Sequence, residues 1–108
     1  MATNFASQVW KITKKIPRGK VATYGQISKE LRSKNYELRI DPRMVGFALH
    51  QNRDLKVPCH RVVDRNGRLA PNFGFSGARE QRERLISEGV KFNDKMHVDL
   101  AKCLWNKL

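Results

Sequence analysis

The 108 residues include 22 Lys or Arg against 10 Asp or Glu, which gives a formal net charge of +12, and 40% of them are hydrophobic. This size and composition predict one compact domain over residues 1–108, and they argue against a second cofactor-binding unit, intrinsic disorder and a membrane-spanning helix, which needs about 20 consecutive apolar residues. Because the positive charge is spread along the chain, we expect a polyanionic partner, and nucleic acid is favoured over an anionic membrane surface or a merely soluble basic protein.

A first amphipathic helix is predicted over residues 4–15, where apolar side chains recur at helical spacing: Phe5, Val9, Ile12 and Ile16. The turn sequence at 17–20 should end it. Thr23 is followed three residues later by Gln26, the pattern of a capping box. A second helix is therefore predicted over residues 24–31, with a loop over residues 32–39 behind it.

A third helix is predicted over residues 42–51, because Asp41 and Pro42 are a typical N-cap and first helical residue. Its apolar face consists of Val45, Ala48 and Leu49. Arg43 lies in its first turn, and Gly46 allows another backbone to come close. Two short helices of which the second opens with an arginine are consistent with a helix-turn-helix, although many small helical domains share this spacing.

The second half is predicted to contain a β-hairpin and one further long helix. Residues 61–63 and 68–69 flank a turn at 64–67 that contains Asn-Gly, so a small wing is expected there. After a loop, a helix over residues 78–88 should bury Leu85 and Ile86 and end at Gly89. Apolar residues from Val90 to Trp105 should pack back on the core. The expected fold is a mainly α, small α+β domain of the winged helix-turn-helix kind.

The two cysteines, Cys59 and Cys103, are expected to be unpaired, since a chain with one possible bridge inside the cell is usually reduced. The sequence has neither a Cys-x-x-Cys motif nor Cys and His at zinc spacing, so no structural metal is predicted. The residues after Met1 lack the charged and apolar regions of a signal peptide, and we expect an intracellular protein. Cys103 matches no catalytic motif and is assigned to the core.

Cys59 is followed directly by His60. A cysteine becomes a nucleophile as its thiolate, and a neighbouring base such as His60 can remove its proton. Neighbouring side chains on an extended segment point in opposite directions, however, so adjacency alone leaves an inert thiol beside a surface histidine as the better interpretation.

Resemblance to a known family changes this balance. The segment Pro58-Cys59-His60-Arg61-Val62-Val63 resembles the active-site motif Pro-Cys-His-Arg-Val of the O6-alkylguanine-DNA alkyltransferases. Residues 19–27 resemble the approach to that family's helix-turn-helix, residues 43–46 its recognition helix, and residues 85–89 its late Leu-x-x-Glu-Gly segment. The resemblance covers nearly the whole chain and corresponds to the family's C-terminal DNA-binding and catalytic domain, without the N-terminal domain that many members carry.

The resemblance implies a chemical role for several side chains. Cys59 would attack the alkyl carbon on guanine O6 in a single displacement, His60 would draw off the thiol proton through a water molecule, and Glu88 would orient the imidazole. Tyr24 would hydrogen-bond the departing guanine and supply a proton to it. The thioether left on Cys59 is inert, so each molecule would act once, as a suicide methyltransferase without a cofactor.

The resemblance also implies how DNA is held. Arg43 would enter the base stack and fill the gap left by the flipped nucleotide, with Tyr24 and Gly46 beside it at the DNA. Asn52 would brace the link between the recognition helix and the active-site loop, and the substrate pocket would be lined by Asn52, the Val62 backbone and Ser76. The implied partner is double-stranded DNA containing O6-alkylguanine, and we expect a monomer.

Two features depart from the family pattern. The segment between Tyr24 and Arg43 is longer than usual, and residues 72–78 resemble the family's Asn-Tyr-Ser-Gly-Gly loop only loosely. Residues 81–90, with the short chain, are closer to the alkyltransferase-like proteins, which bind and flip alkylated guanine without repairing it and hand the lesion to nucleotide excision repair. Those proteins typically carry Trp or Ala where this chain has Cys59.

Three functions therefore stay open at this point. A single-turnover alkyltransferase is favoured by Cys59, His60 and Glu88 together, and a lesion-binding protein with an excision-repair partner is the alternative. A winged-helix transcription regulator ranks last, because the small apolar side chains of the third predicted helix are poor at reading base edges.

Overall fold

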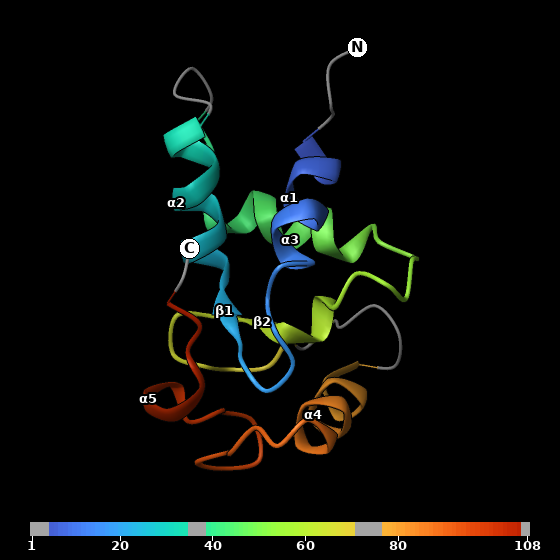
Figure 1. Cartoon of the computed structure of the whole chain (residues 1–108), viewed down its shortest axis with the longest axis vertical. Coiled ribbons are helices and arrows are strands. Elements are labelled where there is room, and N and C mark those ends of the chain that lie inside the picture. Colours follow the sequence, from blue (N-terminus) through green and yellow to red (C-terminus); the bar gives the residue numbers. More distant parts are fainter. Residues whose placement is uncertain (1–4, 35–38, 71–76, 107–108) are drawn as a thin grey trace.

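Helices α1 to α3 form one layer of the molecule, and α4 and α5 form another, with a short sheet between them (Figure 1). The computed structural model describes residues 5–34, 39–70 and 77–106. In chain order the elements are α1 (Phe5–Thr13), β1 (Ala22–Thr23), α2 (Tyr24–Lys34), α3 (Pro42–His50), the 3-10 helix η1 (Cys59–Arg61), β2 (Val62–Val63), α4 (Gly77–Ser87) and α5 (Leu100–Cys103). The predicted mainly helical α+β class is confirmed.

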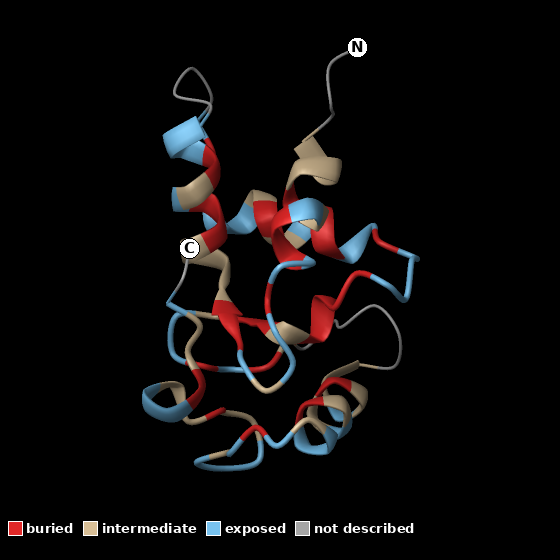
Figure 2. Ribbon diagram, in the orientation of Figure 1, coloured by how far each residue is buried: buried red, intermediate tan, exposed pale blue. Residues whose placement is uncertain are grey.

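The layer of α1, α2 and α3 encloses the first core. The apolar stripes of the three helices face one another, and the buried side chains from these helices are Val9, Ile12, Ile27, Leu31, Val45, Ala48 and Leu49. Indole Nε1 of Trp10 donates to the carbonyl of Ala48 at 2.8 Å and ties α1 to α3. Figure 2 shows the buried faces of these helices turned towards one another. Burial of apolar surface therefore fixes how α3 is presented.

The predicted starts of α2 and α3 are confirmed by the hydrogen bonds that cap them. Thr23 Oγ1 accepts from the Gln26 amide at 3.1 Å, and Gln26 Oε1 accepts from the Thr23 amide at 2.8 Å, which is a complete capping box. Asp41 caps α3 by accepting from the Met44 amide at 2.9 Å. The predicted end of α2 is wrong, because the helix continues to Lys34, whose ammonium pairs with Glu30 one turn earlier at 3.0 Å.

The predicted wing hairpin is wrong in its pairing. Strand β2 pairs in parallel with β1, with Ala22 opposite Val62, while Arg68 forms an antiparallel bridge to His97. Both valines of β2 are buried, so this strand lies in the sheet between the two helical layers and does not form an exposed wing. The tight turn itself is present. Gly67 has a φ of +83°, and a Cβ there would lie 2.8 Å from the Val98 carbonyl.

The layer of α4 and α5 encloses a second core made of Val21, Val63, Leu69, Leu85, Val90, Val98 and Cys103. The C-terminal segment packs back as predicted, and the Trp105 amide donates to the Val21 carbonyl at 2.7 Å. Gly89 ends α4 as predicted: its amide donates to Ile86 and that of Val90 to Leu85, a Schellman motif. The predicted burial of Ile86 is wrong. Its side chain is 46% exposed, because it lies about 100° around the helix from Leu85, which faces the core.

Within the described ranges, no helix combines the length and apolarity that crossing a bilayer requires. The same ranges contain no group of three or more His, Cys, Asp or Glu that could hold a metal ion. Cys59 and Cys103 are both free and buried, and Cys103 lies in the second core, as predicted.

Candidate active site

Cys59 is the first residue of η1 and lies between the end of α3 and strand β2. Its side chain is buried, with 7% of the residue exposed. The sulfur accepts a hydrogen bond from Nδ2 of Asn52 at 3.2 Å, and its thiol is 3.8 Å from the Leu49 carbonyl. Asn52 also donates to the carbonyl of Asp54 and accepts from its amide. Asn52 thus links the end of α3 to the segment that carries the thiol.

The environment of Cys59 favours the protonated thiol. Burial raises the pKa of Cys59, because a charged sulfur loses its hydration there, and the hydrogen bond from Asn52 only partly offsets this. At neutral pH the sulfur is therefore a thiol at rest. Its use as a nucleophile requires a base that takes the proton as the new bond forms.

His60 and Glu88 are brought together from η1 and from the residue that follows α4. Nε2 of His60 lies 2.9 Å from Oε2 of Glu88. The same carboxylate is held by Arg61, whose Nε and one terminal nitrogen donate to its two oxygens at 3.0 and 2.8 Å. Arg61 also donates to the Ile16 carbonyl at 2.8 Å. A buried, bidentate ion pair therefore fixes the group that orients the histidine.

The protonation states follow from these contacts. Burial alone would raise the pKa of Glu88, but the hydrogen bonds from Arg61 and His60 outweigh it and hold the pKa below its usual value. An ionised carboxylate only accepts hydrogen bonds, so Nε2 of His60 carries the proton. Nδ1 is then the unprotonated nitrogen, and within the described part of the chain this buried atom has no hydrogen-bond partner. Burial lowers the pKa of His60 despite Glu88, so the ring is a neutral base.

The hydrogen bonds of the Cys59 sulfur are made with Asn52 and Leu49 and not with His60. Adjacency in the sequence therefore does not give direct contact between the two polar atoms. Proton transfer from the thiol to Nδ1 would need a bridging group, in agreement with the water-mediated route that the family resemblance implies.

Tyr24 is the first residue of α2 and lies against α3. A Cβ built on Gly46 would be 4.0 Å from Cε1 of the Tyr24 ring, an ordinary van der Waals distance, so the ring lies against this part of α3. Burial raises the pKa of Tyr24 to about 12, and the negative charge of Asp64, with that of Cys59 once its thiol has ionised, adds to the effect. The phenol therefore keeps its proton throughout the physiological range.

The remaining predicted site residues fall in different places. Arg43 is exposed in the first turn of α3. Val62 is buried, and its carbonyl accepts from Nε2 of Gln81 at 3.0 Å, so a base at this carbonyl would have to share it. Ser76 lies outside the described residues, as does most of the 72–78 segment.

Two polar residues at the site were missed by sequence reasoning. Arg61 was recognised only as part of a motif, although it supplies the ion pair to Glu88. Gln81 is fully buried on α4; it donates to the carbonyls of His60 at 3.2 Å and Val62 at 3.0 Å and accepts from the Ala70 amide at 2.8 Å. The available signal was its position one turn before Leu85, on the helix face that turns to the core.

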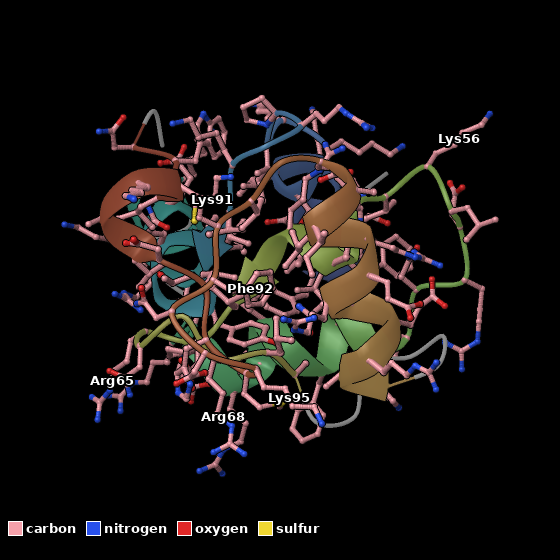
Figure 3. All side chains as sticks on the ribbon, turned by 90° about the horizontal axis from the view of Figure 1, so that it is seen from below. Lys56, Arg65, Arg68, Lys91, Phe92 and Lys95 are labelled. Atoms are coloured by element: carbon pink, nitrogen blue, oxygen red, sulfur yellow. The ribbon has the colours of Figure 1, made fainter. Side chains whose placement is uncertain are left out.

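Positive charge reaches well beyond these groups. Figure 3 shows Arg65 and Arg68 extending outward at the rim of the molecule when it is seen from below, and Arg65, Arg68 and Lys95 are all exposed. With the formal charge of +12, these exposed basic residues can attract a polyanion such as a nucleic acid.

Comparisons with known proteins find similarity to methyltransferases and to alkyltransferase-like proteins. The family model described as "6-O-methylguanine DNA methyltransferase, DNA binding domain" matches residues 4–90. Alkyltransferase-like protein 1 of Schizosaccharomyces pombe is 34% identical over 106 residues, covering 94% of each chain. A methylated-DNA–protein-cysteine methyltransferase of Methanocaldococcus jannaschii is 39% identical over 92 residues, covering 82% of this chain and 51% of that protein. The crystal structure of S. pombe Atl1 with damaged DNA containing O6-carboxymethylguanine aligns with a TM-score of 0.79 at 28% identity, covering 98% of this chain and 99% of that one.

Proposed function

The chain belongs to the 6-O-methylguanine DNA methyltransferase family, whose DNA-binding domain model it matches, and we propose that it repairs DNA by moving an alkyl group from O6 of a flipped-out guanine to Cys59. The observation that carries this proposal is the relay at the site. Glu88 fixes Nε2 of His60, which leaves an unprotonated Nδ1 without a partner among the described residues, on the residue that follows the buried Cys59. A relative that only binds the lesion has no need of a nucleophile and a base.

The proposed reaction is one displacement at the alkyl carbon. A bond forms between that carbon and Sγ of Cys59 as the bond from the carbon to guanine O6 breaks, and the electron pair of the broken bond stays on the guanine. His60 takes the thiol proton at Nδ1 through a bridging water, the hydroxyl of Tyr24 supplies a proton to the guanine, and Tyr24 regains a proton from the solvent as His60 releases its own, so that the net transfer is of the thiol proton to the guanine. The products are an alkylated cysteine and unmodified guanine. Since a thioether does not release its alkyl group, each molecule reacts once.

The DNA is proposed to lie along α3. O6 of guanine is covered inside a duplex, so the nucleotide must be turned out of the stack, which costs a few kcal/mol and least for a weakly paired damaged base. Arg43, exposed at the start of α3, would occupy the space that the nucleotide leaves. The general positive charge would provide binding with little sequence preference.

A second candidate function is recognition of the lesion without transfer, with repair completed by an excision-repair partner. It is favoured by the extent of the similarities. The chain aligns with an alkyltransferase-like protein over 94% of both lengths, whereas it spans about half of the methyltransferase it matches. In that function Cys59 would remain unmodified in the presence of bound lesion.

A titration of lesion DNA separates the two. A duplex with one O6-methylguanine is incubated with increasing protein, digested to nucleosides, and its remaining O6-methylguanine is measured. Transfer predicts loss of one lesion for each protein molecule added. Cys59→Ala should bind the duplex and leave the lesion intact, and the matched variant Cys103→Ala should behave as the wild type. Tight binding by the wild type with no loss of lesion would overturn the proposal in favour of recognition alone.

A further inference from the structure

One face of α3 carries an exposed phenylalanine in line with Arg43. Arg43, Phe47 and His50 follow one another at spacings of four and three residues, which places them along a single stripe of the helix. All three are exposed, and Phe47 is 63% exposed. The opposite face, made of Val45, Ala48 and Leu49, is buried in the first core. Phe47 therefore contributes little to the stability of the fold.

The exposed apolar surface does not stop at Phe47. An open groove of about 410 Å³ runs between α1 and α3 and is lined by Phe5, Ala6, Met44, Phe47, Ala48 and Gln51. An open groove with an exposed aromatic side chain at its rim is a candidate contact surface for a partner. The surface is also cationic, because the sequence of α3 contains Arg43 and no Asp or Glu. The nearby Asp41 caps the helix and partly offsets the charge of Arg43, within a molecule of net charge +12.

Charge selects the partner of this surface. A second copy of the chain would bring another +12 against a stripe that is itself cationic, so self-association through α3 is opposed electrostatically. A nucleic acid duplex offers the required combination. Its phosphates attract Arg43 at one end of the stripe, while deoxyribose rings and base edges in the minor groove of the DNA accept the apolar side chain of Phe47.

We infer that Phe47 is a second DNA-contacting side chain. It would pack as an apolar wedge into the minor groove of the DNA, one turn of α3 away from Arg43, which fills the gap left by the flipped nucleotide. The inference rests on the proposed placement of α3 on lesion DNA. Proteins that widen or bend the minor groove insert Phe, Met or Leu at base steps in this way. Met44 and Phe5 line the groove of the protein beside Phe47 and would continue the apolar contact with the DNA. Phe47 would thus add affinity that comes from apolar contact and not from ion pairing.

The salt dependence of binding tests this assignment. Each phosphate contact that is lost lowers the slope of log affinity against log salt by about 1, whereas loss of an apolar contact leaves the slope unchanged. For an O6-methylguanine duplex, Phe47→Ala should weaken binding about tenfold at every salt concentration with the same slope, consistent with loss of a buried aromatic side chain. Phe47→Leu should recover most of the affinity.

The matched control is Ile86→Ala, which removes an exposed apolar side chain from α4. It should bind as the wild type does. Thermal unfolding of Phe47→Ala should match the wild type, since the side chain is largely exposed. Wild-type affinity in Phe47→Ala would overturn the inference and leave the proposed function standing, whereas absence of lesion binding by the wild type would remove the proposed function itself. A change from dimer to monomer in Phe47→Ala by sedimentation would show that the stripe binds a second copy, which also overturns it.

Discussion

Nε2 of His60 and Oε2 of Glu88 are 2.9 Å apart, and this contact determines which nitrogen of the imidazole is available to the thiol. The carboxylate accepts from Nε2 and so leaves Nδ1 as the base. Arg61 holds the same carboxylate, which keeps it ionised and in place. The proposed nucleophile, its proposed base and the carboxylate that orients the base come from two adjacent residues of η1 and from the residue that follows α4.

Removing the charge of Glu88 should slow the proposed transfer and destabilise the fold. Glu88→Gln leaves Arg61 without a charge partner in a site where both side chains are largely buried. We expect the rate of methyl transfer to fall about 100-fold and the free energy of unfolding to fall by about 3 kcal/mol. Single-turnover kinetics and urea unfolding measure the two effects.

The matched control for this change is Glu80→Gln, which breaks a more exposed pair with Arg84 on the same helix. Its effect on stability should be below about 1 kcal/mol, with no effect on the transfer rate. Equal effects of the two substitutions would contradict a role for Glu88 in orienting His60.

The pH dependence of transfer should report the lowered pKa of His60. A lowered pKa means that the ring stays neutral, and able to accept a proton, to a more acidic pH than an exposed histidine would. The transfer rate should therefore hold from neutral pH downward and then fall in a step centred below pH ~6.5, the ordinary value for histidine. His60→Gln should lose the step together with most of the rate. A step centred above the ordinary value would mean that Glu88, and not burial, dominates the pKa.

Asn52 should control the acidity of the thiol. Its hydrogen bond to the sulfur lowers the pKa of Cys59 against the larger effect of burial, so Asn52→Ala should raise that pKa further and slow alkylation of Cys59 by iodoacetamide at fixed pH. Peptide mapping follows Cys59 and Cys103 in the same sample. Cys103, whose thiol donates to the Asp99 carbonyl instead, is the internal reference and should keep its rate. A faster reaction of Cys59 in Asn52→Ala would indicate that the asparagine shields the sulfur.

Gln81 should be required for the backbone geometry at the site. Gln81→Met has a similar volume but leaves the carbonyls of His60 and Val62 and the Ala70 amide without this partner. We expect the free energy of unfolding to fall by about 2 kcal/mol, since buried polar groups without partners are costly. Transfer should slow while affinity for undamaged DNA is retained. Unchanged urea midpoints would show that water replaces the amide.

Local sequence signals predicted the helical part of the fold well. The capping box at Thr23 and Gln26, the N-cap at Asp41 and the glycine that ends α4 each act within a few residues, so the sequence records them directly. The pairing of β2 was not predicted, because strand partners far apart in the chain are selected by burial on both sides of the sheet. An Asn-Gly turn fixes the turn and not the partner of each strand.

The residues of the site divide in the same way, into those that a sequence motif predicted and those that depend on tertiary contacts. Cys59, His60 and Glu88 were predicted through a family motif, and the structure brings the last two into contact. The contribution of Arg61 and Gln81 depends on α4 returning to η1, a tertiary contact that helical spacing does not encode. Phe47 was overlooked because an apolar residue on an amphipathic helix is ordinarily assigned to the core. Its exposure follows from its position around the helix: Phe47 lies on the side of α3 opposite the buried Val45, Ala48 and Leu49.

The central claim, that Cys59 accepts the alkyl group, is tested most directly by weighing the intact protein after incubation with excess O6-methylguanine duplex. The account predicts a complete shift by the mass of one methyl group in place of one hydrogen, located by peptide mapping on the peptide that contains Cys59 and absent in Cys59→Ala. An unchanged mass under conditions in which the protein is saturated with lesion DNA would contradict it and would identify the chain as a protein that recognises the lesion without removing it.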